Sequence, residues 1–468
     1  MGEPYLVTLS PKTYLRLKRT NEAKLLHCHK CGREFLPGDE VCFNCGSSRK
    51  RYDKSCFKGD LIVLGDNKPI SEYFEGNYCF GGDGQESRIS NTMRREYSGD
   101  MNILKASGLM PLELTPEHPV LVVTGKLPRG GGNIMFSEPY WKPAKEVVPK
   151  HAKAAGDYLL SPILMGTNST TDMSLQKYII KYSREGMMDH FSLNEATAWL
   201  LGLYAAEGST HLAGPKRKPE RMQVQIELTL GQKDVTRGIL AHAIDVVKTI
   251  GAPYSIKNNN GHPCLVIYST PLGRALKDWM GQGSDNKKVP DFIMTHVDNA
   301  IVSAFIDGYL RGDGNFTRHW TAATTSKLLA LQVQMLSIRN GMFAALSGPH
   351  ASHGFNDVND KTGLPQYWLC FGNGSTDIHN RRKWMDGFVP SPVSSNTISH
   401  FDGLVYNLET ESQSYLASNA IVHNCAAQVN FQVNPPPNYE ETRKAVLAEV
   451  ETWKKEQKKK AEEEKKKK

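Results

Sequence analysis

The sequence predicts a multidomain protein in which an all-β unit is split by a helix-rich α+β insert and flanked by a cysteine-rich segment and a charged helical tail. At roughly 150 residues per domain, 468 residues correspond to about three folded units. Short β-type runs fill residues 56–164, helical patterns fill residues 192–387, and β character returns at residues 403–424. A fold interrupted by a long insertion gives this order, because insertions succeed in exposed loops whose ends lie close together.

The composition is that of a folded protein whose basic charge lies mainly in its tail. Hydrophobic residues make up 39% and charged residues 23% of the chain, and no run approaches the ~20 apolar residues of a membrane helix. The N-terminus lacks the apolar core of a secretory signal, so we expect a cytoplasmic protein with no membrane partner. Residues 454–468 hold nine lysines and four glutamates, so only +3 of the net charge of +8 lies elsewhere.

Residues 1–55 are predicted to form a zinc ribbon. Two CxxCG knuckles, CHKCG and CFNCG, are separated by ten residues. In a reducing compartment, four thiolates at this spacing are typical of a closed tetrahedral Zn²⁺ site, and a redox CxxC or a chance cluster is the alternative. The expected ligands are Cys28, Cys31, Cys42 and Cys45.

Residues 56–165 are predicted to be all-β. The runs DLIVLGD, ISEYFEG, NILKASG, LELTPEHPVLVVTG and GDYLLSPIL are β-type and are closely punctuated by Gly and Pro. No amphipathic helical stretch appears among them.

The helical region contains an internal repeat, LLGLYAAEG at residues 200–208 and IDGYLRGDG at residues 306–314. In each copy an acidic residue follows the helical pattern, Glu207 in the first and Asp313 in the second, and a glycine suited to a left-handed helix cap comes next. Small residues four apart share a helix face, so the two helices are expected to approach closely. These small residues are Gly202 and Ala206 in the first copy, and Gly308 and Gly312 in the second.

The two acids predict a cation site. A carboxylate at a helix C-terminus is electrostatically unfavourable because the helix dipole is negative there, and two such carboxylates repel each other. A divalent cation would relieve both effects. The alternative is a pair of ordinary helices that end in polar residues before a glycine cap.

Strand, helix and strand patterns follow each copy, and the segment at residues 193–386 resembles the LAGLIDADG homing endonucleases. The resemblance implies two pseudo-symmetric αββαββα halves in a monomer, with strands that form a saddle over double-stranded DNA. It also implies Mg²⁺ held by Glu207 and Asp313, and catalytic lysines at Lys287, with the neighbouring Lys288 as the alternative, and at Lys327. Glu207 departs from the aspartate usual in the first motif.

The ends of the split β unit carry a second set of motifs. Cys56 opens its first segment, TPEHPV at residues 115–120 lies inside it, and HNC at residues 423–425 follows its second segment. Together they resemble the blocks of a protein-splicing intein, whose horseshoe-like β domain is called Hint. The resemblance implies splicing segments at residues 56–165 and 396–424, separated by an endonuclease at residues 166–395.

The intein resemblance assigns roles to individual residues, and splicing needs no cofactor. Cys56 is the first nucleophile, His118 protonates the leaving amide nitrogen, and Thr115 assists the oxyanion. The acyl group then passes to Cys425, Asn424 cyclises to cut the second junction, and His423 assists that step. The chain departs from many inteins by having Gln413 near the position of a histidine.

Residues 425–468 are predicted to form the second part of the interrupted host, with a lysine-rich helical tail. Basic stretches in both host parts suit a nucleic-acid or ribosome partner. A protein-binding module with a solubilising tail is the alternative.

The sequence therefore predicts excision of residues 56–424, ligation of Ser55 to Cys425, and site-specific cleavage of double-stranded DNA at the host gene that lacks the insertion. The alternative is an insert that splices but no longer cuts DNA, in a nucleic-acid- or ribosome-associated zinc-ribbon protein.

Overall fold

The computed structural model divides the chain into two units, residues 54–425 and the combination of residues 1–53 with 426–468. All described residues belong to the first unit; they are 55–126, 134–151, 155–179, 188–213, 223–259, 261–351, 363–372, 384–385 and 387–424. The four predicted zinc cysteines, Cys425 and the lysine-rich tail lie outside the described residues.

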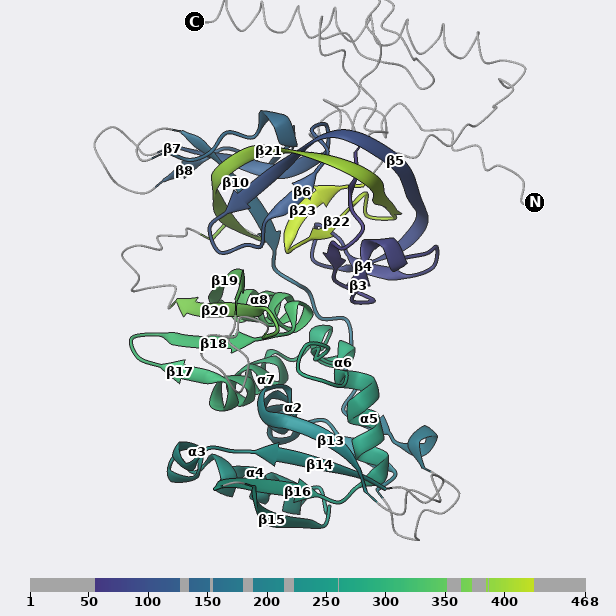
Figure 1. The fold of residues 1–468 in the computed structure, drawn as a ribbon, viewed down its shortest axis with the longest axis vertical. Helices are drawn as coiled ribbons and strands as arrows, with labels where there is room; N and C mark the ends of the chain where they lie inside the picture. The colour runs from purple at the N-terminus through teal and green to yellow at the C-terminus, as the bar shows by residue number, and fades with distance from the viewer. Residues whose placement is uncertain are drawn as a thin grey trace, which may run out of the picture. The chain divides into compact units, whose positions relative to one another are not determined.

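Two distant segments of the chain build one β body, as the interleaved purple-blue and yellow-green strands of Figure 1 show. Its first segment contributes β1 (Phe57–Lys58), β2 (Ile62–Val63), β3 (Lys68–Pro69), β4 (Tyr78–Phe80), β5 (Glu86–Ala106), β6 (Leu112–Leu114), β7 (Pro119–Lys126), β8 (Met135–Phe136), β9 (Tyr140–Pro143) and β10 (Gly156–Pro162). Its second segment contributes β21 (Phe388–Thr410), β22 (Ser414–Ala417) and β23 (Ala420–His423). The predicted all-β unit split by an insert is confirmed, except that the ISEYFEG run begins with a 3₁₀ turn, η2 (Ile70–Glu72), where a strand was expected. A second 3₁₀ turn is η3 (Ala144–Glu146).

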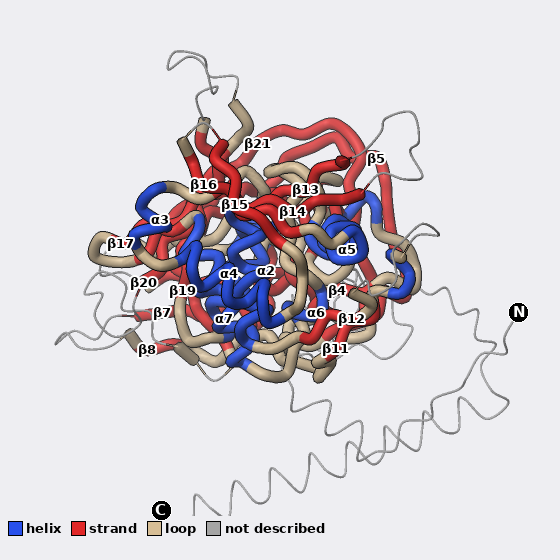
Figure 2. The backbone as a smooth tube through the Cα atoms, turned by 90° about the horizontal axis from the view of Figure 1, so that it is seen from below, coloured by secondary structure: helices blue, strands red, loops and turns tan. Residues whose placement is uncertain are grey.

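A long ribbon of β5 and β21 joins the two segments of the β body. The strands have 21 and 23 residues and pair antiparallel from Val393 opposite Ala106 to Thr410 opposite Ile89. Because β21 begins at Phe388, residues 388–395 belong to the β body, whereas the sequence predicts that the insert extends through them. Figure 2 shows the two strands running together.

The insert contains two halves of the same design. The first has α2 (Glu195–Glu207), β13 (Gly208–Ala213), β14 (Gln223–Thr229), α3 (Gln232–Thr236), α4 (Ile239–Thr249), β15 (Tyr254–Asn259), β16 (His262–Ile267) and α5 (Thr270–Met280). The second has α7 (Asn299–Gly312), β17 (Gly314–Phe316), β18 (Trp320–Thr324), α8 (Lys327–Arg339), β19 (Phe343–His350) and β20 (Gln366–Gly372). Each half forms a four-stranded sheet, with strand orders β13-β14-β16-β15 and β17-β18-β20-β19, so the predicted repeat is confirmed through its second pair of strands.

Shorter elements lead into and connect the two halves. They are β11 (Asp172–Ser174), η4 (Gln176–Tyr178), β12 (His190–Ser192) and α6 (Asp291–Met294).

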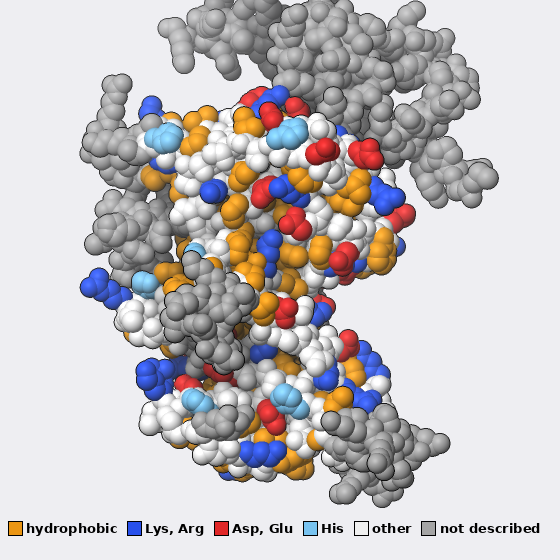
Figure 3. Space-filling view, in the orientation of Figure 1, with side chains coloured by type: hydrophobic (Ala, Val, Ile, Leu, Met, Phe, Trp, Pro, Cys, Tyr) orange, Lys and Arg blue, Asp and Glu red, His pale blue; other side chains and the backbone are white. Residues whose placement is uncertain are grey.

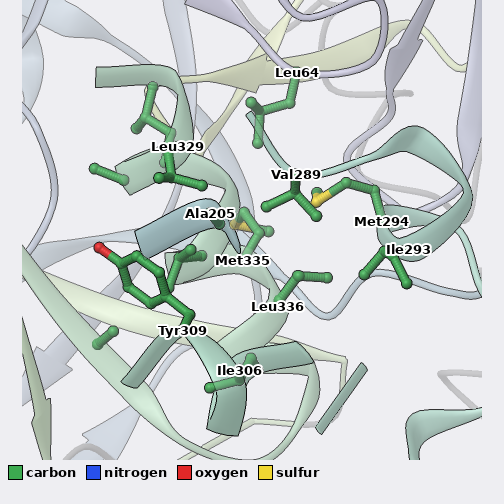
Figure 4. Packing of buried hydrophobic residues seen from close by; sticks show 14 of the residues in the cluster. Leu64, Ala205, Val289, Ile293, Met294, Ile306, Tyr309, Leu329, Met335 and Leu336 are labelled. Atoms are coloured by element: carbon green, nitrogen blue, oxygen red, sulfur yellow. The ribbon is translucent and has the colours of Figure 1, made fainter. Parts of the chain in front are cut away.

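Helices α2 and α7 are in close contact, as the small residues predict. A Cβ added at Gly202 would lie 2.0 Å from the Phe305 carbonyl oxygen, and one at Gly308 would lie 2.0 Å from the Trp199 carbonyl oxygen. Apolar side chains of both helices and of α8 pack around this contact in Figure 4, where Ala205, Ile306, Tyr309, Met335 and Leu336 are labelled.

The predicted left-handed glycine caps are wrong. Gly208 is extended, with φ −83° and ψ 145°, and Gly314 is not in the left-handed region; α2 passes directly into β13, and α7 passes into β17 after Asp313. Glycine is needed here for space instead. A Cβ at Gly208 would lie 2.1 Å from the Tyr204 ring, and one at Gly314 would lie 2.1 Å from the Leu310 carbonyl oxygen.

We expect Gly308→Ala to destabilise the chain even though alanine is favoured in a helix interior by about 1 kcal/mol. The added methyl group meets backbone, so α2 and α7 must move apart, which typically costs about 1–3 kcal/mol. Chemical denaturation measures the change, with exposed Ser303→Ala on the same helix as the control. A Gly308→Ala chain more stable than the wild type would contradict the close helix contact.

Candidate functional site

The peptide bond between Ser55 and Cys56 is buried, and both its N–H and its carbonyl oxygen are hydrogen-bonded. Ser55 is 0% and Cys56 is 2% exposed. The Cys56 N–H donates to Thr115 Oγ1 at 2.8 Å, and the Ser55 carbonyl oxygen accepts from Asn407 Nδ2 at 2.6 Å. Thr115 therefore contacts the amide nitrogen of this bond, which differs from the oxyanion role expected from the sequence. No sequence motif points to Asn407, which lies 352 residues from Ser55.

His118, in the first segment of the β body, contacts the last strand of the second segment. It follows Thr115 in a tight turn, in which the His118 N–H donates to the Thr115 carbonyl oxygen at 3.0 Å, and it precedes β7. Its Nε2 lies 3.1 Å from the His423 carbonyl oxygen. Strand β7 pairs with β23 at Val120 and Val422, which brings the two histidines together.

The protonation state of His118 follows from its surroundings. Burial, followed by the neighbouring His423, lowers the pKa of His118 to about 3, so the ring is neutral at pH 7. A carbonyl oxygen only accepts hydrogen bonds, so Nε2 carries the proton. Nδ1 is buried, has no hydrogen-bond partner among the described residues, and is therefore a bare lone pair.

The last described residues of the chain, His423 and Asn424, are buried and hydrogen-bonded. His423 Nδ1 lies 2.7 Å from the Asn424 carbonyl oxygen and donates to it, because a carbonyl cannot donate. The Asn424 N–H donates to the Gln413 carbonyl oxygen at 3.1 Å, and Asn424 Nδ2 donates to the Thr410 carbonyl oxygen at 3.4 Å. Gln413 thus supports this junction through its backbone.

The Cys56 side chain is a thiol at neutral pH. Burial raises the pKa of Cys56, and the Arg95 guanidinium, which hydrogen-bonds the thiol, opposes that rise. Attack by this sulfur therefore needs a group that takes its proton.

The predicted acid pair lies where α2 and α7 end. Burial, followed by the charge of Asp313, raises the pKa of Glu207 to about 7, and burial raises the pKa of Asp313 to about 6, opposed by Lys287. The Glu207 side chain lies beside Gly312, where an added Cβ would be 3.0 Å from Glu207 Cγ.

The structure brings Lys287 to the acids, whereas Lys327 lies at the start of another helix. Lys287 Nζ donates to the carbonyl oxygens of Tyr204 at 2.9 Å and Ala206 at 3.1 Å in the last turn of α2, where the Tyr204 carbonyl also accepts from the Gly208 N–H. Burial lowers the pKa of Lys287 to about 8, and both acids oppose this effect. Lys327 is the first residue of α8. The residue before it, Ser326, donates its hydroxyl hydrogen to the Lys287 carbonyl oxygen.

The chemistry of the acid pair fits Mg²⁺. Mg²⁺ in proteins usually takes one or two carboxylates, with waters and phosphate oxygens as its other ligands. Glu207 and Asp313 provide oxygen donors; burial and then the charge of Asp313 raise the pKa of Glu207, and a bound cation would relieve that repulsion.

Known proteins of different kinds align with most of this chain, although no protein-family model matches it. The chain is 24% identical over 422 residues to the ATP-dependent DNA helicase Hel308 of Thermococcus kodakarensis, covering 79% of this chain and 36% of the helicase. It is 26% identical over 416 residues to an iron–sulfur cluster assembly SufBD family protein of Mycobacterium tuberculosis, covering 81% and 44%. An uncharacterized protein of Methanocaldococcus jannaschii is 24% identical over 421 residues, covering 79% and 50%. The chain thus spans only a third to a half of the length of these relatives.

The solved structures that resemble part of the chain include homing endonucleases. A mesophilic variant of the homing endonuclease I-DmoI is 15% identical, with a TM-score of 0.29, and the match covers 38% of this chain and 88% of the endonuclease. The homing endonuclease I-WcaI bound to its DNA recognition sequence is 11% identical, with a TM-score of 0.23, and the match covers 38% and 77%.

Among the described residues, no helix has both the length and the apolar character that a membrane span requires.

Proposed function

We propose that residues 56–424 are a self-splicing intein that excises itself, joins Ser55 to Cys425, and carries a metal-dependent DNA endonuclease. The observation that supports the proposal is that the Ser55–Cys56 bond and the residues His423 and Asn424 are buried in one β body. The Ser55–Cys56 bond is held by Thr115, and His118, three residues later, contacts the carbonyl next to Asn424. The masses of the products formed on expression test the proposal.

The first step converts a peptide bond into a thioester. Cys56 Sγ bonds to the Ser55 carbonyl carbon, the C–N bond breaks, and the thiol proton ends on the Cys56 nitrogen. By the resemblance to inteins, His118 assists this transfer as the group that brings a proton to the leaving nitrogen, and its ring packs against Phe57, the residue that follows Cys56, with ring centroids 4.2 Å apart. Thr115 holds that nitrogen through its hydroxyl group.

The second junction is cut by Asn424 itself. Cys425 first takes the acyl group from Cys56 by thiol exchange. The Asn424 side-chain nitrogen then attacks its own carbonyl carbon, forms a succinimide and expels the amine of Cys425. His423 supports this step because it donates to the carbonyl oxygen on which negative charge develops. A final sulfur-to-nitrogen shift gives a normal peptide bond between Ser55 and Cys425.

The relatives favour an element that is inserted into unrelated proteins. A DNA helicase and an iron–sulfur cluster assembly protein have no activity in common by name, yet both align with about four-fifths of this chain. The alignment to the helicase covers 79% of the chain, and residues 56–424 are 369 of its 468 residues, also 79%.

The insert is proposed to cut double-stranded DNA at the host gene that lacks the insertion. Glu207 and Asp313 would hold Mg²⁺, which supplies positive charge that stabilises the phosphate as it is cleaved. Lys287 supports the same site, because its buried ammonium lies close enough to both acids to shift its pKa. On the face shown in Figure 3, Lys and Arg side chains are scattered among acidic and apolar ones. Any DNA affinity therefore depends on local arrangement of charge.

The alternative is an insert that splices but no longer cuts. Incubation of the excised insert with Mg²⁺ and the uninterrupted host gene separates the two: a double-strand break supports the endonuclease, and a folded protein that leaves the DNA intact supports the alternative.

The ligated host is proposed to be a zinc-ribbon protein with a nucleic-acid or ribosome partner. Its 99 residues, 1–55 and 425–468, contain both CxxCG knuckles. We expect the ligated product to hold one Zn²⁺, since four thiolates at this spacing make a closed site. Elemental analysis measures it: Cys42→Ser should lose the metal, and Ser47→Ala should keep it. Removal of zinc by a chelator without any change in structure would contradict a structural site.

A further inference from the structure

We propose that Asn407 is the donor that stabilises the oxyanion in the first acyl transfer, and that Tyr415 is the positioning residue that orients its amide. The inference rests on the proposed splicing function and identifies the group that acts on the Ser55 carbonyl.

The position of Asn407 follows from strand pairing. Strand β1 pairs with β21 through Phe57 opposite Tyr406, so Cys56 faces the next residue of β21, Asn407. The Asn407 side chain is 0% exposed, and its Nδ2 donates to the Ser55 carbonyl oxygen at 2.6 Å across 352 residues of sequence.

Two donors fix the orientation of the Asn407 amide. The Tyr415 hydroxyl donates to Asn407 Oδ1 at 2.6 Å, and the Leu408 N–H donates to the same atom at 2.7 Å. Rotating the amide by 180° would turn its NH₂ group toward the Leu408 donor and its oxygen toward the Ser55 carbonyl oxygen. The network therefore permits one orientation, in which the NH₂ group faces the carbonyl.

This geometry suits the charge that develops during the reaction. When Cys56 Sγ bonds to the Ser55 carbonyl carbon, the carbonyl π electrons move onto the oxygen, which becomes negative. A donor that is already fixed in a buried site stabilises this charge without reorganisation, and removing one such donor typically lowers a rate by about 10²–10³-fold. The Thr115 hydroxyl serves the other side of the bond, because it accepts from the amide nitrogen.

The test measures thioester formation in a full chain that carries Asn424→Ala and Cys425→Ala, so that neither later step can proceed. Hydroxylamine cleaves a thioester at Ser55–Cys56, and the rate of cleavage is followed by mass spectrometry. We expect Asn407→Asp to slow this cleavage about 100-fold at pH 7.5, because a carboxylate faces the developing oxyanion. We expect Tyr415→Phe to slow it less, because the Leu408 N–H still holds the amide.

A pH series separates this role from a structural one. In the Asn407→Asp chain, a carboxyl group that takes up a proton becomes a neutral acid and can again donate to the Ser55 carbonyl oxygen. The ratio of the Asn407→Asp rate to the wild-type rate should therefore rise as the pH falls, whereas a purely structural loss would leave this ratio constant.

The control is cleavage after Asn424 in a Cys56→Ala chain, which should change less than about twofold on adding Asn407→Asp if the body stays folded. If Asn407→Asp also slows cleavage after Asn424, the rate of thioester formation in the Tyr415→Phe chain decides whether Asn407 acts as the donor. Equal thioester rates in the variants and the wild type would overturn the role of Asn407 and leave splicing intact. Absence of thioester in the chain with native Asn407 would instead overturn the proposed function.

Discussion

Replacing Asn424 by alanine is expected to abolish cleavage at the second junction while the thioester at Cys56 still forms. The proposed cleavage needs the side-chain nitrogen of Asn424 as the group that attacks the carbonyl carbon, and alanine has no such group. The full chain of 52.2 kDa should then accumulate, and hydroxylamine should release residues 1–55 from it. Mass spectrometry of both samples measures the outcome.

Asn91→Ala is the matched control, since Asn91 is an exposed asparagine on β5. This variant should splice like the wild type. A ligated host of normal mass from the Asn424→Ala chain would contradict the proposed chemistry at the second junction.

Replacing Asp313 by asparagine is expected to abolish DNA cleavage and, at the same time, to stabilise the metal-free chain. The variant loses one of the two carboxylates proposed to hold Mg²⁺, so cleavage of the uninterrupted host gene should fall by about 10³-fold or more, the scale of several kcal/mol of charge stabilisation. Gel electrophoresis of the DNA substrate measures this loss. Asp245→Asn, a change at an exposed residue of α4, is the control and should cut normally.

The stabilising effect follows from the sign of the pKa shifts. The pKa of Asp313 is raised to about 6 and that of Glu207 to about 7, so each acid binds its proton more tightly in the folded chain. The contribution of these two acids to the free energy of unfolding should therefore be highest below the ordinary carboxyl pKa of about 4 and be lost as the pH rises toward 6 and 7. Asp313→Asn should reduce this loss, and thermal melting at pH 5 and pH 8 measures it. Because His118 is the same in both chains, the difference between them reports on the acids; a stability difference between Asp313→Asn and the wild type that is the same at pH 5 and pH 8 would contradict the buried acid pair.

The repeat in the insert could be predicted because its signal is local. Two small residues four positions apart, an acid and a glycine occur together in each nine-residue motif, and the structure confirms the close approach at Gly202 and Gly308. The reason for the glycine at Gly208 could not be predicted, because it depends on the Tyr204 ring, which folds back on the end of its own helix. A helix that continues into a strand and a helix that ends in a glycine cap can have the same sequence pattern.

The junction chemistry was predictable only in part. Cys56 and Asn424 are recognisable from their neighbours in sequence, but Asn407 becomes visible only when β1 pairs with β21. The long ribbon that sets this register was also missed, because β5 is mostly polar and exposed along its middle. The pairing register of two strands that are hundreds of residues apart is not encoded in any local sequence pattern. The donor to the Ser55 carbonyl oxygen could therefore be identified only from the structure.

The most direct test of the central proposal is the mass of the products that accumulate when the full chain is expressed. Splicing predicts two products, the excised residues 56–424 and a ligated host of 99 residues with Ser55 bonded to Cys425. A folded chain that remains intact at 52.2 kDa at every expression temperature would contradict it.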